Sequence, residues 1–150
     1  MPQVPTRASS RLLVTAASAA AIVVLISSAD AQVVTTVDGQ PIAEQDIQER
    51  TRLDELSGRK TPDRQDMIGE LSNEIEEISQ ARRHGIAPSD AEVNKAFDGI
   101  AMRMGIDGQK LTDLLSKRGA SATTLKQRLR AQIAGTRLER GGFDRHDAGH

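Results

Sequence analysis

The stretch HGIAPSDAEV, residues 84–93, holds the end of one helix and the start of the next. Gly85 follows a long helical pattern, and glycine readily takes the left-handed conformation that ends many helices. Ser89 and Glu92 form an S-x-x-E capping box, in which each side chain accepts a hydrogen bond from a free backbone amide. The stretch therefore predicts two consecutive helices joined by a short link.

The residues before this link predict a helix with one buried face. Thr61-Pro62-Asp63 suits a helix start, with Thr61 as the cap and Pro62 in the first helical position. Arg82 and Arg83 fall in the last turn, where cations meet the negative end of the helix. Apolar residues recur between them at steps of three and four, as on one helical face: Met67, Ile68, Leu71, Ile75 and Ile78.

Further upstream, the pattern predicts a short strand and then a first helix. Three valines within residues 33–37 are β-branched, and the pair Asp38-Gly39 indicates a turn. A helix is expected from Ala43 until Gly58 stops it. Its loose apolar face consists of Ile42, Ile47, Leu53 and Leu56.

Three more helices are predicted after the link. The third runs from Ser89 to Gly105, the fourth from Asp107 to Gly119, and the fifth from Ser121 to a break at Gly141-Gly142. The fold class is therefore all-α: about five helices in a small irregular bundle, with a short N-terminal strand and turn. The domain is expected over residues 32–140, with a flexible tail over 141–150.

Residues 1–31 have the features of a secretory signal. Arg7 and Arg11 make a basic start, residues 12–26 are almost wholly apolar, and Ala29-Asp30-Ala31 has small residues at both flanking positions. A membrane anchor is the alternative, but it needs about 20 apolar residues. Cleavage after Ala31 is expected to leave an exported protein that begins at Gln32 and has no stable membrane insertion.

The composition of residues 32–150 limits the function classes. The 18 basic and 20 acidic side chains give no basic excess for binding nucleic acid. The chain has no cysteine for a disulfide, no tryptophan or tyrosine, and only two phenylalanines. Such a small supply of large apolar side chains predicts a domain with little surplus stability.

Candidate chemical groups in the chain have simpler explanations than catalysis or metal binding. His146 and His150 are four residues apart, but a closed zinc site needs four ligands, so we expect no metal. No phosphate-binding loop, dinucleotide fingerprint or nucleophile elbow is present, so we expect no cofactor and no catalytic residue. Four glutamates alternate with the apolar stripe of the second helix and are expected to face water: Glu70, Glu74, Glu76 and Glu77.

The apolar stripes themselves are the informative feature. Most of each stripe is expected to form the core. Part of the third and fourth helices is predicted to stay exposed and bind peptide, because methionine adapts to varied apolar partners; Met67 favours the same idea on the second helix. The predicted peptide-binding residues are Met102, Met104, Leu111, Leu114 and Leu115.

Three segments together resemble the N-terminal domain of SurA-type periplasmic chaperones and related parvulin-containing foldases. They are VDGQPI at 37–42, the link at 84–93 and LKQRLRAQI at 125–133. The resemblance extends over about residues 33–140. One departure follows the last segment, where the family often has an aromatic residue and this chain has Ala134-Gly135-Thr136. In the family one or two isomerase domains usually follow, and the resemblance is expected to imply the chaperone part without the isomerase part.

The resemblance implies a periplasmic, ATP-independent chaperone that is not itself an enzyme and binds unfolded or nascent exported polypeptides, including outer-membrane proteins. Two alternatives stay open. The first is a truncated peptidylprolyl isomerase that lacks its catalytic domain. The second is a helical module that docks on one fixed partner.

Overall fold

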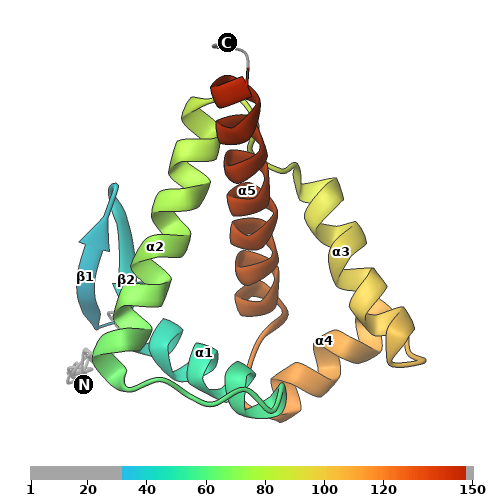
Figure 1. Ribbon diagram of the computed structural model, residues 1–150. Helices are drawn as coiled ribbons and strands as arrows, with labels where there is room; N and C mark the ends of the chain where they lie inside the picture. Colours follow the sequence, from blue (N-terminus) through green and yellow to red (C-terminus); the bar gives the residue numbers. More distant parts are fainter. Residues whose placement is uncertain (1–31, 148–150) are drawn as a thin grey trace, which may run out of the picture.

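The computed structural model describes residues 32–147, with side chains described as far as Gly141. The predicted fold class is confirmed: five helices form a small bundle, and two short strands make a hairpin at its N-terminal end (Figure 1). The predicted signal segment, residues 1–31, lies outside the described residues.

The N-terminal hairpin consists of strand β1 (Val33–Val37) and strand β2 (Gln40–Ala43), which pair antiparallel. Asp38 and Gly39 form the turn, with φ values of 47° and 78°. Two positive φ values in a two-residue turn are what an Asp-Gly pair favours in a hairpin. The sequence predicted one strand and a turn, so the second strand is an addition, and Pro41 lies within it.

Five helices follow the hairpin: α1 (Glu44–Leu56), α2 (Arg64–Arg83), α3 (Asp90–Arg103), α4 (Gly108–Lys117) and α5 (Ala122–Asp147). Figure 1 shows α2 and α5 next to each other in the centre, with α1 and α4 at the foot of the bundle. α5 packs against each of the other four helices, most extensively against α2. The last helix in the sequence therefore holds the others together.

The capping box predicted in the central link is confirmed by two reciprocal hydrogen bonds. The backbone N–H of Glu92 donates to Ser89 Oγ at 3.2 Å, and the Ser89 N–H donates to the Glu92 carboxylate at 2.8 Å. Asp107 caps α4 and Ser121 caps α5 by the same kind of bond to the first turn. These four side chains fix where three of the helices begin.

The predicted start of α2 is wrong by a small shift. Asp63, rather than Thr61, is the cap, because its carboxylate accepts the backbone N–H of Asp66 at 2.9 Å. The first helical residue is Arg64, so Pro62 lies before the helix. Both Thr and Asp are good N-caps, and the presence of Pro62 between them does not determine which of the two is the cap.

The apolar core is divided into three clusters. The largest joins α1, α3, α4 and α5 through Leu53, Phe97, Ala101, Leu111, Leu115, Ala120 and Leu125. The second joins the hairpin, α1 and α2 through Ile42, Ile47, Met67, Leu71 and Ile75. The third joins α2 to α5 through Ile78, Ala81, Ala131 and Ala134. Met67 is 1% exposed, so it belongs to the core rather than to an adaptable surface.

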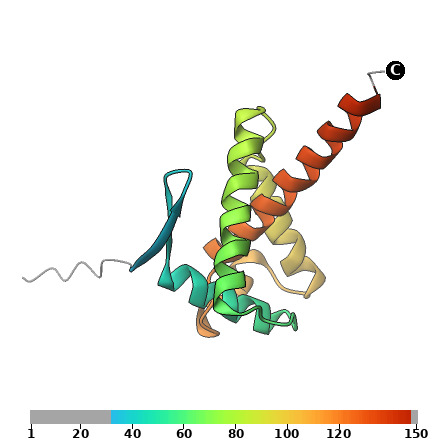
Figure 2. The same ribbon diagram turned by 60° about the vertical axis from the view of Figure 1, so that its left-hand side comes forward.

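The predicted end of the fifth helix at Gly141-Gly142 is wrong, because α5 continues to Asp147. Figure 2 shows its last turns running on beyond the end of α2. Glycine costs about 1 kcal/mol in a helix relative to alanine, but it has no ring to clash with the preceding turn as proline has. Two glycines therefore weaken a helix without ending it.

Candidate functional site

The five residues predicted to bind peptide divide into two groups by burial. Leu111 and Leu115 are 2% and 5% exposed and belong to the largest core cluster. Leu114, Met104 and Met102 are 36%, 52% and 76% exposed. Residues four apart share a helix face, so turning Leu111 and Leu115 inward leaves Leu114 at the edge of α4.

A concave apolar groove of about 290 Å³ lies where α1, α3 and α4 meet the start of α5. We call it the α4 groove. Its lining residues are Leu53, Leu56, Ser57, Ile100, Met104, Leu111, Leu114, Leu115, Arg118 and Leu125. Four of the five predicted residues thus lie around one hollow, and Met102 is not among its lining residues.

Leu56 is a residue of the groove that sequence reasoning placed elsewhere. The apolar pattern put it on the buried face of the first helix, but its side chain is 40% exposed and lines the α4 groove. Leu56 is the last residue of α1, just before the turn at Gly58. Its place as the last residue of α1 is a weak sequence signal for this exposure, because no further turn of the helix follows to cover it.

The lining of the α4 groove determines which chemistry it supports. Arg118 is its single charged residue and Ser57 the other polar one, while the remaining lining residues are leucine, isoleucine and methionine. The lining contains no carboxylate or imidazole that could act as a general base. What the groove offers is reversible burial of apolar side chains.

A second concavity, of about 720 Å³, lies between the hairpin, α1, α2 and the start of α5. The Glu49 carboxylate in its wall accepts hydrogen bonds from the hydroxyls of Ser121 and Thr124, both at 2.6 Å. Burial opposes ionisation of Glu49, but these bonds and one from Gln45 outweigh it and lower its pKa from the ordinary value. The polar groups here are therefore used to join α1 to the start of α5.

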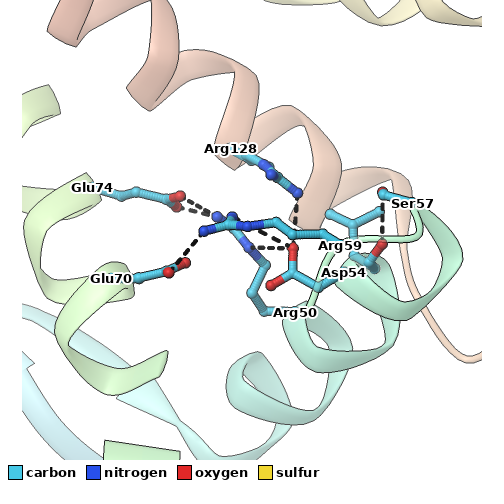
Figure 3. A network of polar contacts seen from close by, with 8 residues as sticks. Arg50, Asp54, Ser57, Arg59, Glu70, Glu74 and Arg128 are labelled. Carbon is cyan, nitrogen blue, oxygen red and sulfur yellow. Dashed lines mark hydrogen bonds and ion pairs between the residues drawn. The ribbon is translucent and has the colours of Figure 1, made fainter. Parts of the chain in front are cut away.

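Asp54 on α1 is the buried centre of a group of ion pairs, shown in Figure 3. Its side chain is fully buried, and Arg50, one turn earlier, is 2% exposed. Asp54 Oδ1 lies 3.0 Å from Nη1 of Arg128 on α5, 3.7 Å from Nη1 of Arg59 and 3.9 Å from Nε of Arg50. One carboxylate oxygen thus faces three guanidinium groups, two from residues close to it in the sequence and one from α5.

The same arginines extend the contacts to α2. Arg50 forms two hydrogen bonds with the Glu74 carboxylate, one of them from Nη1 at 3.2 Å, and Arg59 Nη2 lies 2.8 Å from Glu70 Oε1. Glu74 is 14% exposed, so the prediction that it faces water is wrong, and Glu70 is partly buried as well. Three cations and three carboxylates form this ion-pair network, which joins α1, α2 and α5 (Figure 3).

Arg50 and Asp54 were missed by the sequence analysis, although a signal for them exists. Ile47 is buried in the core, and positions 47, 50 and 54 are spaced so that they share one face of a helix. A charged pair in phase with a buried apolar residue indicates an internal ion pair. The partners on α2 and α5 carry no such signal, because they are far away in the sequence.

Glu92 combines the α3 capping box with an ion pair to α5. Its carboxylate accepts a hydrogen bond from Arg137 and another from the Ser89 N–H, and these lower its pKa to about 2. A pKa below the unfolded value means that Glu92 contributes stability above about pH 4.5 and that this contribution is lost as pH falls toward 2. We expect Glu92→Gln to unfold less steeply on acidification than the wild type between these two values, as measured by urea denaturation at stepped pH.

The control for this measurement is Glu76→Gln on α2. Glu76 is exposed, accepts a hydrogen bond from Gln80 and has no ion pair among residues 32–141. The Glu76→Gln substitution removes one carboxylate, as Glu92→Gln does, but it removes no contact with a cation. If both variants respond equally to acid, the Arg137 contact does not influence stability.

Within residues 32–147, no helix is both long and apolar enough to cross a membrane. The same residues contain no group of three or more histidine, cysteine, aspartate or glutamate side chains arranged to hold a metal ion. His146 and His150, which the sequence analysis considered as ligands, lie beyond the described side chains.

Comparison with known proteins gives one informative similarity. The chain is 27% identical over 115 residues to Chaperone SurA of Ralstonia nicotianae. The likeness supports a SurA-related family. The match covers 71% of this chain but 23% of the relative, so the chain spans less than a quarter of that SurA protein's length. No family model matches the chain, and no solved structure matches it.

Proposed function

We propose that the chain is a SurA-type chaperone module that holds unfolded polypeptides without ATP. The observation that carries the proposal is the α4 groove, where the partly exposed Leu56, Met104 and Leu114 border an apolar hollow. Exposed apolar side chains that gather around a concave surface are typical of a binding site. The similarity to a protein named Chaperone SurA supports the same function.

The proposal includes the region, the compartment and the partners. Residues 32–140 correspond in this proposal to the N-terminal helical domain of the family, which acts in the periplasm after removal of residues 1–31. Its clients are unfolded or nascent exported polypeptides, including outer-membrane proteins. The apolar lining of the groove supports binding rather than bond-making, so the module is proposed to need no cofactor and to have no enzymatic activity.

The size of the groove sets the strength of binding. A hollow of about 290 Å³ accommodates two or three side chains of a client. Each fully buried large apolar side chain contributes roughly 1.5–3 kcal/mol, against which the ordering of both partners must be set. The expected dissociation constants are therefore roughly micromolar to millimolar, which suits reversible holding.

The proposal predicts that Leu114→Ser loses most of the ability to prevent aggregation. The assay is light scattering from a denatured outer-membrane protein, with the purified protein in several-fold molar excess. Leu114 is 36% exposed, so the substitution is expected to lower the free energy of unfolding by about 1–2 kcal/mol, less than the loss of a fully buried leucine. Circular dichroism checks that the fold is kept.

The matched control is Met102→Ser, because Met102 is an exposed apolar residue that does not line the groove. It is expected to hold clients as the wild type does. Equal loss in both variants would show that general surface hydrophobicity, rather than the groove, is responsible. A wild-type protein that never suppresses aggregation would overturn the proposed function.

A further inference from the structure

The exposed leucine of α4 is surrounded by cations. On a helix, residues three and four apart have Cβ atoms about 5–6 Å from each other. Lys110, Lys117 and Arg118 occupy these positions around Leu114, and all three side chains are exposed. Arg118 also lines the α4 groove. One rim of the groove is therefore basic.

These cations are not neutralised by neighbouring carboxylates. None of the three forms an ion pair with any described residue. Asp107 accepts the backbone N–H of Lys110 as a helix cap, and Asp113 accepts a hydrogen bond from Gln109. Over residues 103–118 there are four cations and two carboxylates, although the whole chain has a net charge of −1.

We propose that the α4 groove selects peptide segments in which two or three aliphatic residues are flanked by carboxylates. This rests on the proposed function and specifies its class of client. Leu56, Met104 and Leu114 cover the aliphatic side chains, while the basic rim of α4 faces the acidic flanks. Complementary charge at the rim of an interface adds specificity and speeds encounter more than it adds affinity.

The shape of the site favours a peptide over a lipid surface. A helix that lies on a membrane presents a continuous apolar face along its length. In α4 the leucines at 111 and 115 are buried in the core, so Leu114 is the one exposed leucine of this helix. The groove is also concave and bordered by α1 and α3, which suits separate side chains better than a flat bilayer.

The experiment compares three synthetic peptides with the same aliphatic centre and with flanks of two glutamates, two glutamines or two lysines. The protein has no tryptophan or tyrosine, so the peptides carry a fluorescent label and binding is followed by anisotropy. At 0.05 M salt the glutamate peptide is expected to bind about tenfold more tightly than the glutamine peptide, and the lysine peptide more weakly than either. At 1 M salt, where the screening length is about 3 Å, the differences disappear.

A charge-reversed protein provides the second arm. The double variant Lys110→Glu, Lys117→Glu is expected to prefer the lysine peptide, whereas Lys95→Glu, Arg140→Glu keeps the original order. The control makes the same change in net charge at two exposed residues outside the groove. If the reversed variant does not fold, Lys110→Gln, Lys117→Gln should remove the preference without reversing it.

The outcomes separate this inference from the proposed function. If the wild type suppresses aggregation and binds all three peptides equally, the acidic preference is wrong and the chaperone function stands. If it neither holds clients nor binds any peptide, the chaperone function itself is wrong. Binding to anionic phospholipid vesicles without a preference among the peptides would make α4 a membrane contact. Sedimentation could also show a dimer, and if the double variant Lys110→Glu, Lys117→Glu dissociates it, the groove is a contact between two copies. Both the vesicle result and the dimer result would overturn the inference.

Discussion

Replacing Arg50 with Met is expected to lower the free energy of unfolding by about 3–5 kcal/mol. Arg50 is 2% exposed and pairs with Glu74 across the interface of α1 and α2. Methionine fills a similar volume but removes the charge, so the Glu74 carboxylate keeps its partial burial without a partner. Asp54, which is fully buried, also loses one of the three cations near its Oδ1 atom.

Arg52→Met is the matched control, because Arg52 lies on the same helix and also forms an ion pair. Its partner is Glu55, and the two side chains are 54% and 47% exposed. Exposed pairs are worth about 0–1 kcal/mol, since water screens them. Urea denaturation followed by circular dichroism measures both variants. Similar losses for the two arginines would mean that Arg50 is not held in the ion-pair network.

The helix starts were the most predictable part of this fold. A cap such as Ser89 with Glu92, or Asp107 at α4, is formed by residues three apart, so all its partners are visible in one short stretch of sequence. The end of α5 was less predictable, because glycine weakens a helix and the surroundings determine whether it stops. The placement of Gly141 within a continuing helix shows this difference.

The ion-pair network could not be predicted, for a physical reason. Arg50 and Glu74 are 24 residues apart, and Asp54 and Arg128 are 74 residues apart. Whether two such charges meet depends on how α1, α2 and α5 cross, and helix periodicity does not specify that crossing. The sequence shows only that Arg50 and Asp54 share a face with buried Ile47.

The candidate groove was predictable in its location but not residue by residue. The spacing of the leucines of α4 shows that Leu111 and Leu115 share one face and that Leu114 lies beside it. Which face turns inward depends on the positions of α1 and α3. Leu56 was missed for the same reason, since its exposure depends on the hollow that α1, α3 and α4 leave between them.

Replacing Phe97 with Ala is expected to lower the free energy of unfolding by about 3–5 kcal/mol, chiefly through the cavity it leaves. Phe97 is 2% exposed and belongs to the cluster that joins α1, α3, α4 and α5. The Lys126 amino group lies 4.9 Å above the centre of its ring, so a cation–π contact between α3 and α5 is lost as well. The chain has few large side chains with which to refill the space.

Two substitutions on α3 separate the contributions of this residue. Phe97→Leu keeps most of the volume and is expected to lose about 1–2 kcal/mol, from imperfect packing and the missing ring. Met102→Ala removes a side chain that is 76% exposed and should change stability by no more than about 0.5 kcal/mol. Because Leu111 and Leu115 belong to the same cluster as Phe97, Phe97→Ala should also abolish client holding, while Met102→Ala retains it. If Phe97→Ala unfolds at the same temperature as Met102→Ala, α3 does not pack on α4. The groove would then lose one of its walls.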